Sequence, residues 1–336
     1  MEWMGPALSA SFADTLGADV MGKPAWLWLM FVGIVLVLLV LDLGVLQKRV
    51  REVGVRQSLL LSAFYIGAGL AFGGWIWASQ GAQPGMEYIT GYLIEKSLSL
   101  DNVFVISLIF GYFAVPAQYQ HRVLFWGILG VIVMRAVMIG LGAAMVQNFS
   151  WVLYLFGAFL VFTGIKMLLP SDGPLNVADS PVLKLARRWM RVTDDYHGNR
   201  FFVRLPDAAT GKVARFATPL FLALVMVEAA DLVFAVDSVP AIFAITTDPY
   251  IVYTSNIFAI LGLRALYFAL AAMVHRFHAL KYALALVLVF IGGKIFWNQI
   301  VGKMDPAISL GVTLALIAGG VVASLVWPAR PAEAAR

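Results

Sequence analysis

Uninterrupted blocks of apolar residues, each about 20 residues long, constrain the fold of this chain more than any other feature. A helix rises about 1.5 Å per residue, so about 20 apolar residues cross the hydrocarbon core of a bilayer. Of the 336 residues, 61% are hydrophobic and 13% are charged, whereas about a quarter of the residues in soluble domains are charged. The pattern excludes an ordinary soluble domain and predicts an all-α polytopic membrane protein.

The apolar blocks predict about nine transmembrane helices. They fall at 25–46, 56–79, 87–113, 120–146, 149–169, 216–245, 250–275, 279–300 and 306–327. We expect a single transmembrane domain over 25–327, with an N-terminal segment 1–24, one long loop 170–215 and a tail 328–336. Within the loop, two short apolar runs separated by a Pro/Asp/Gly turn region predict a small hairpin.

Basic residues predict the orientation of these helices. Most of the 24 Lys and Arg residues lie in alternate connections and in the tail, whereas Lys23 and Lys303 lie on the opposite side. The positive-inside rule then places the N-terminal segment outside, and the 170–215 loop and the tail in the cytoplasm. The net charge of +5 is therefore explained by cytoplasmic loops, and no nucleic-acid partner is expected.

Two parts of the chain resemble each other. The segment Ala143-Ala144-Met145-Val146 recurs 128 residues later as Ala271-Ala272-Met273-Val274. At the same offset, Tyr154, Gly164 and Lys166 recur, and further residues match upstream. The two copies, at about 87–169 and 216–300, each contain three predicted spans, so the second copy is inverted in the membrane. Inverted repeats are typical of secondary transporters, whose substrate sites lie near the midplane between the repeats.

Carboxylates within the predicted spans are the strongest indication of function. Apart from Glu87, which is the first residue of its span, there are six of them: Asp42, Glu95, Asp101, Glu228, Asp231 and Asp237. Each charge at a helix centre costs about 2.5–3.5 kcal/mol on insertion scales. Three cations lie at similar depth and are expected to balance part of this charge: Lys96, Arg135 and Arg264. Since the acids outnumber the cations, protons, a metal cation or water must supply the remainder.

The types of side chain indicate a hard divalent cation. Carboxylates, with the side-chain oxygens of Asn102 and Ser238, suit Mn²⁺, Mg²⁺ or Ca²⁺, and ligand type does not distinguish these ions. The chain has no cysteine, and its histidines all fall in or beside the predicted cytoplasmic connections, which disfavours Zn²⁺ and Cu⁺. Pro219 and Pro240 make the 216–245 span the expected place for a helix break that brings the acids onto one ion.

Three motifs carry a resemblance to a known family. They are Glu95-Lys96-Ser97-Leu98-Ser99-Leu100-Asp101-Asn102, the segment from Glu228 to Pro240, and the segment from Thr254 to Arg264. With these motifs the chain resembles TerC-family membrane proteins over nearly its whole length. The resemblance implies a bacterial inner-membrane exporter, with manganese efflux as the role of close relatives. It also implies that the intramembrane acids matter, and Asp42 fits the acidic position of the first span. Some members are linked instead to protein insertion or to metal stress.

We therefore expect a secondary transporter that exports a divalent cation, Mn²⁺ first, by alternating access, with proton exchange as a hypothesis from charge balance. In this hypothesis Glu95, Glu228 and Asp231 hold the ion near the midplane, while Asp101 and Asp237 complete the site from opposite sides. The alternatives are a divalent-cation channel and a scaffold or insertion factor. No nucleophile–base set, phosphate-binding glycine loop or cofactor motif indicates an enzyme. The sequence predicts neither a cofactor nor an oligomeric state.

Overall fold

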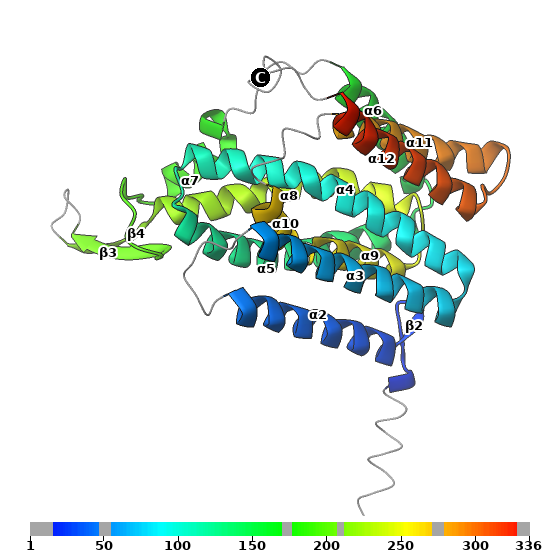
Figure 1. Ribbon diagram of the computed structural model, residues 1–336, viewed down its shortest axis with the longest axis horizontal. Helices are drawn as coiled ribbons and strands as arrows, with labels where there is room; N and C mark the ends of the chain where they lie inside the picture. Colours follow the sequence, from blue (N-terminus) through cyan, green and yellow to red (C-terminus); the bar gives the residue numbers. More distant parts are fainter. Residues whose placement is uncertain (1–15, 47–54, 170–176, 207–211, 271–278, 328–336) are drawn as a thin grey trace, which may run out of the picture.

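The computed structural model describes residues 16–46, 55–169, 177–206, 212–270 and 279–327. They form a bundle of long helices with two small β-hairpins (Figure 1). The helices of the bundle are α2 (Ala25–Leu46), α3 (Val55–Gln80), α4 (Ala82–Tyr112), α5 (Ala117–Asn148), α6 (Val152–Leu168), α8 (Pro219–Phe243), α9 (Pro249–Ile260), α10 (Leu263–Leu270), α11 (Leu280–Ile300) and α12 (Pro306–Val326). The tail 328–336 and the second copy of the repeated segment at 271–274 lie outside the described residues.

Seven segments of the described chain are long and apolar enough to cross a membrane, which supports a helical multi-pass protein. Two predicted spans, α4 and α6, do not meet the same standard. Helix α4 has 31 residues but carries Glu87, Glu95, Lys96 and Asp101, and α6 has only 17 residues. The count of nine crossings therefore stays a prediction for these two helices.

The bundle is built around α9. The segment that contains α9 and α10, Pro249–Ala269, is 89% buried, the highest share among the candidate spans. In Figure 1, α3, α4, α5 and α8 run side by side along the length of the molecule with α9 among them, and α2 lies along one edge. Helices α6, α11 and α12 form a group at the upper right of this view and pack against α4 and α8. Buried polar groups near the middle of the bundle are therefore enclosed by several helices.

The helix break lies in a different span from the one we predicted. Helix α8 is continuous from Pro219 to Phe243 although Pro240 lies within it. The break falls instead between α9 and α10, at Leu261 and Gly262. Gly262 has a φ of +80°, a conformation that favours glycine, and a Cβ there would lie 2.6 Å from Cβ of Tyr65. Close packing of α3 on a left-handed residue thus sets the break, which a search for prolines does not detect.

Glycines let α6 and α11 pack with their backbones nearly in contact. A Cβ on Gly164 would lie 2.6 Å from the carbonyl oxygen of Ala285, and one on Gly292 would lie 2.6 Å from the carbonyl oxygen of Gly157. The order of these contacts shows that the two helices are antiparallel. Small residues are the usual means of close helix approach in membranes.

The described part of the 170–215 loop contains a short helix and the expected hairpin. Helix α7 (Pro181–Trp189) buries Leu183 and Ala186 against the bundle. Strands β3 (Phe202–Pro206) and β4 (Val213–Ala217) pair antiparallel, which confirms the hairpin. The hydroxyl of Tyr196 donates to the carbonyl of Phe113 at 2.7 Å, and burial raises the pKa of this phenol. The loop is thus attached to the end of α4.

Candidate functional site

Arg135 of α5 joins the two acids that the sequence places near the midplane. Its guanidinium binds Asp231 of α8 through two hydrogen bonds, Nε to Oδ2 at 3.2 Å and Nη2 to Oδ1 at 3.0 Å. Nη1 forms an ion pair with Glu95 of α4. Arg135 is 0% exposed, Glu95 2% and Asp231 5%. Acids that lie far apart in the sequence therefore share one buried cation.

Three uncharged side chains complete this arrangement: Asn102, Ser238 and Asn256. Together with Glu95, Arg135 and Asp231 they form what we call the Arg135 cluster. Nη1 of Arg135 also donates to Asn256 Oδ1 at 3.1 Å and to Ser238 Oγ at 3.3 Å. The amide of Asn256 donates to Glu95 Oε2 at 3.0 Å, and that of Asn102 donates to Asp231 Oδ1 at 3.3 Å. Hydrogen bonds of this kind lower the cost of keeping charges in a low-dielectric interior.

Asn102 is the one member of the cluster with a buried side-chain atom that lacks a hydrogen-bond partner within the described structure, its Oδ1. Asn102 and Asp231 also line a void of about 20 Å³ among apolar residues of α4, α5, α8 and α10. A void needs at least about 10–15 Å³ to hold a water molecule. The void is thus large enough for one water molecule beside the side chains of Asp231 and Asn102.

Asp101 and Asp237 face away from the Arg135 cluster. Asp237 accepts a hydrogen bond from Thr163 of α6 at 3.4 Å, and Lys166 of the same helix acts on it electrostatically. Lys281, at the start of α11, interacts electrostatically with Asp101. Each of these acids therefore interacts with the third long helix of the other predicted repeat. Within the described residues, no hydrogen bond or ion pair joins either of them to Glu95 or Asp231.

Glu228 and Asp42 occupy two further places. Glu228 lies against α5 at Gly130, where a Cβ would overlap its carboxylate. Asp42 of α2 pairs with Arg264 of α10, with Oδ2 and Nη2 3.0 Å apart, and Nη2 also donates to the carbonyl of Asp42 at 2.7 Å. Arg264 therefore balances the acid of the first span, as Arg135 balances the two central acids.

Lys96 is next to Glu95 in sequence but does not bind a carboxylate within the described structure. Its ammonium group donates to the carbonyl oxygens of Ala259 at 3.0 Å and Leu261 at 3.3 Å. These carbonyls belong to the end of α9 and the break that follows it. Of the three cations predicted to balance the acids, Lys96 is thus the one without a carboxylate partner among the described residues.

The arrangement holds two negative charges and one positive charge at the centre of the protein. Among the described residues, no three Asp, Glu or His side chains stand close enough to hold a metal ion. Glu95 and Asp231 approach each other only through Arg135. In this arrangement a divalent cation could reach both carboxylates only if the guanidinium shifted, and Asn102 would then offer a third oxygen.

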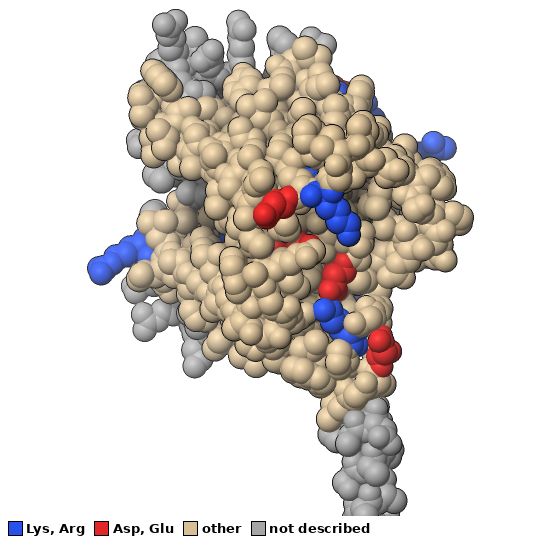
Figure 2. Space-filling model, turned by 90° about the vertical axis from the view of Figure 1, so that its right-hand side faces the viewer, with Lys and Arg blue, Asp and Glu red and all other residues tan. Residues whose placement is uncertain are grey.

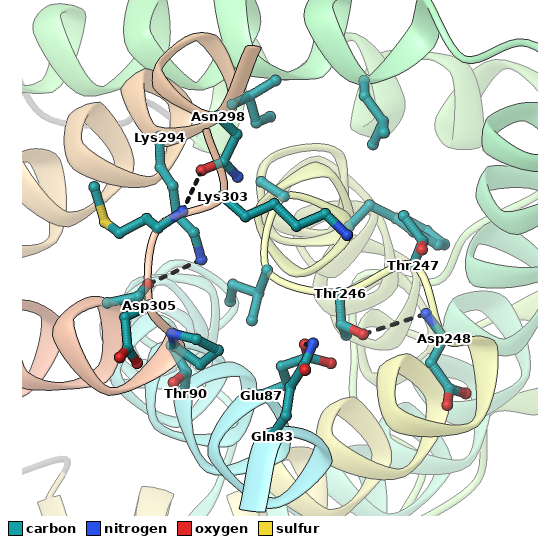
Figure 3. Close-up of a pocket in the computed structure, with 18 of the residues that line it drawn as sticks. Gln83, Glu87, Thr90, Thr246, Thr247, Asp248, Lys294, Asn298, Lys303 and Asp305 are labelled. Atoms are coloured by element: carbon teal, nitrogen blue, oxygen red, sulfur yellow. Dashed lines mark hydrogen bonds between the residues drawn. The ribbon is translucent and has the colours of Figure 1, made fainter. Parts of the chain in front are cut away.

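A large cavity opens at the end of the bundle where α3 meets α4, with a volume of about 1100 Å³. In Figure 2, which looks onto this end, acidic and basic side chains gather on a face that is otherwise mostly uncharged. Figure 3 shows Glu87, Asp248, Asp305, Lys294 and Lys303 around the cavity. Thr90 of α4 also lines it, five residues before Glu95, which is about 7.5 Å along the helix axis. We call this cavity the vestibule.

Sequence reasoning did not assign a role to Asn256, which binds both Arg135 and Glu95 and is 0% exposed. The signal was present, because an amide in the middle of an apolar span needs a buried partner. Its neighbours Thr254 and Ser255 bond to their own helix backbone instead. Only the packing of α9 against α4 and α5 shows that Asn256, rather than Thr254 or Ser255, belongs to the Arg135 cluster.

Comparison with known proteins identifies the family. The model of the integral membrane protein TerC family matches residues 80–332. A membrane protein of Rickettsia bellii is 49% identical over 89% of this chain and 97% of its own length. STKORF319, a membrane protein of Myxococcus xanthus, is 47% identical over 91% and 93%. The Escherichia coli protein named "Putative membrane-bound redox modulator Alx" is 44% identical over 89% and 94%. No solved structure matches. The chain belongs to the integral membrane protein TerC family.

Proposed function

We propose that this protein is a secondary transporter that exports a divalent cation, Mn²⁺ first, from the cytoplasm across a bacterial inner membrane. The observation that carries the proposal is the meeting of buried Glu95 and Asp231 at Arg135. Buried acids in a membrane protein mark ion or proton paths. The free-energy cost of burying a charged carboxylate keeps such residues rare unless they bind an ion or pair with another charge. Here the single positive charge of Arg135 pairs with the two carboxylates of Glu95 and Asp231, so one negative charge remains to bind a cation.

Mirrored contacts support the inverted repeats that alternating access requires. At the 128-residue offset, Gly157 corresponds to Ala285, and Gly164 to Gly292. The contact of Gly157 with Gly292 therefore has the contact of Ala285 with Gly164 as its counterpart, with the two helices exchanged. The electrostatic effect of Lys281 of α11 on Asp101 and the hydrogen bond of Thr163 of α6 to Asp237 are related in the same way. A two-fold relation of this kind lets one site face either side in turn.

Arg135 would act as the internal counter-cation of the empty carrier. With no ion bound, its guanidinium neutralises Glu95 and partly neutralises Asp231, so the protein can change conformation without exposing bare carboxylates to the low-dielectric interior. When Mn²⁺ arrives, the guanidinium shifts and the ion takes its place on the two acids. The amide oxygen of Asn102, which has no hydrogen-bond partner among the described residues, would become a further ligand.

The vestibule would be the extracytoplasmic exit. The positive-inside rule places the start of α4 and the α11–α12 connection outside, and both line the vestibule. Buried Ile94 and Leu98 lie on α4 at the level of Glu95, below the Thr90 that borders the cavity. With this proposed orientation, the described state would have an open outer cavity above a closed site, which supports a carrier between ion release and return.

Transport assays in proteoliposomes test the proposal. We expect purified protein to move Mn²⁺ with saturation, and Glu95→Gln and Asp231→Asn to abolish the flux. Asp195→Asn in the cytoplasmic loop is the matched control and should transport like the unmodified protein. An unchanged flux in both acid variants would refute the site, and a flux that rises linearly with concentration would favour a channel.

Proton coupling is a separate step of the same assay. The acids outnumber the cations within the spans, so a divalent ion together with one proton would complete the charge balance. We propose exchange of Mn²⁺ against protons, which predicts faster export when the outside is acidic. Equal rates with and without a pH gradient would refute coupling but leave transport intact.

The name of the Escherichia coli relative raises a second candidate, a redox role. This chain contains no cysteine, so its own thiols could not carry such a role. A scaffold or insertion factor is the remaining alternative. It predicts that Asp231→Asn leaves the biological function intact, whereas a transporter requires that carboxylate.

A further inference from the structure

The break between α9 and α10 leaves backbone carbonyl groups without a following turn. An unbroken helix would pair the carbonyl of Ala259 with the amide of residue 263, and that of Leu261 with the amide of residue 265. At the break, these two oxygens instead point at one atom, the Nζ of Lys96, at 3.0 and 3.3 Å. Two carbonyl oxygens that converge on one point form a cation-binding geometry.

The position of this carbonyl pair favours a cation for two reasons. The last turn of a helix carries partial negative charge, because its carbonyl groups are aligned and unpaired. Unwound segments of discontinuous membrane helices coordinate small cations through such carbonyls in many transporters. Lys96 is residue 15 of the 31 in α4, so the pair lies close to the middle of that helix.

The contact of Lys96 with the carbonyl pair is specific. Its side chain is partly buried, and within the described structure its ammonium donates to these two carbonyls and to no carboxylate. The neighbouring Glu95 turns to Arg135 and Asn256 instead. The carbonyl groups at the end of α9 and the positive charge of Lys96 therefore stabilise each other.

We propose that the carbonyl oxygens of Ala259 and Leu261 form a monovalent-cation site, and that the ammonium group of Lys96 occupies it permanently. Lys96 replaces the free ammonium or alkali-metal ion that such a site would otherwise bind. The tethered ammonium holds α9 in its broken form and removes any need for a bound co-ion. This assignment concerns the helix break alone and stands whether or not the protein transports Mn²⁺.

Removal of the tethered charge should create a site for a free cation. We would purify Lys96→Ala and Lys96→Met in detergent with N-methyl-D-glucamine as the only cation, then add ammonium, methylammonium, sodium or potassium chloride. The readout is the midpoint of thermal unfolding. Lys294→Met is the matched control, because Lys294 is also buried but donates to the hydroxyl of Ser309 rather than to a carbonyl pair.

The expected result is a lower midpoint for both Lys96 variants, and a saturable recovery of most of that loss with ammonium or a small alkali cation. N-methyl-D-glucamine, which is too large for the site, should give no recovery. The unmodified protein and Lys294→Met should not respond. Equal responses of all four proteins, or no response of the Lys96 variants, would overturn the proposal. So would Lys96 variants that are recovered equally poorly in ammonium and in N-methyl-D-glucamine during purification.

Flux measurements separate this inference from the proposed function. In proteoliposomes, the Lys96 variants should transport Mn²⁺ only when ammonium or an alkali cation is present, whereas the unmodified protein needs neither. If the unmodified protein carries no Mn²⁺, the proposed function fails, but the stability result still decides the cation site.

Discussion

At the scale of single residues, Arg135 determines how the central acids are accommodated. A buried carboxylate without a partner is costly, and the low dielectric of the interior makes each partner count. Arg suits this place better than Lys, because its planar group presents several donors in a fixed fork. Glu95, Asp231, Ser238 and Asn256 all accept from that fork.

Replacement of Arg135 should therefore destabilise the protein strongly. We expect Arg135→Gln to lower the free energy of unfolding by about 3–5 kcal/mol, since it leaves two carboxylates without their cation. Arg135→Lys keeps the charge but loses the fork, so its loss should be smaller. Denaturant unfolding in mixed micelles measures both. Equal stability of Arg135→Gln and the unmodified protein would show that the cluster is not held by this ion pair.

Asp42 and Arg264 provide a second test at this scale. Their ion pair joins α2 to α10, and Oδ1 of Asp42 has no hydrogen-bond partner within the described structure. We expect Asp42→Asn to destabilise the protein but to leave a measurable Mn²⁺ flux, because this pair lies apart from the Arg135 cluster. Loss of flux in a folded Asp42→Asn protein would place Asp42 on the ion path instead.

At the scale of helices, the sequence predicts positions well and irregularities poorly. Long apolar blocks mark α2, α3, α5 and α12 to within a few residues, because length and hydropathy alone determine a span. The break after α9 was missed, since it depends on the packing of Tyr65 against Gly262 rather than on a proline. We also expected Asp101 and Asp237 to complete the central site from opposite sides, whereas they interact with Lys281 and Thr163 of other helices.

The contact between α6 and α11 offers a sharp comparison between adjacent glycines. A Cβ on Gly292 would meet the carbonyl of Gly157, whereas one on Gly293 would meet nothing within 4 Å. We expect Gly292→Ala to cost about 1–3 kcal/mol by overpacking. Gly293→Ala should be neutral or stabilising by about 0.5–1 kcal/mol, because alanine favours the helix. Unfolding free energies measure both, and equal effects would contradict the close packing.

At the scale of the whole molecule, the distribution of basic residues and the position of the vestibule favour the same direction of transport. Basic residues concentrate at the end with α7 and the β3–β4 hairpin, and the vestibule opens at the other end. The class of protein and its buried acids are therefore accessible from the sequence, whereas the orientation stays a prediction. The choice of partner for each acid is not, since it depends on which helices become neighbours.

Cysteine labelling tests this orientation directly, because the unmodified chain has no cysteine and serves as its own blank. We expect Ser150→Cys, exposed between α5 and α6, to react with a membrane-impermeant maleimide in intact spheroplasts. Lys184→Cys, exposed on α7, should react only after the membrane is opened. The reverse pattern would invert the topology and would place the vestibule in the cytoplasm.

We propose that Glu95 and Asp231 carry a divalent cation out of the cell, and the manganese content of living cells measures this export. Cells that lack their own exporter should accumulate less Mn²⁺ and tolerate more of it when they express the unmodified protein. Asp231→Asn, present at the same level in the membrane, should restore neither property. If Asp231→Asn lowers cellular manganese as far as the unmodified protein does, the account of the site is wrong.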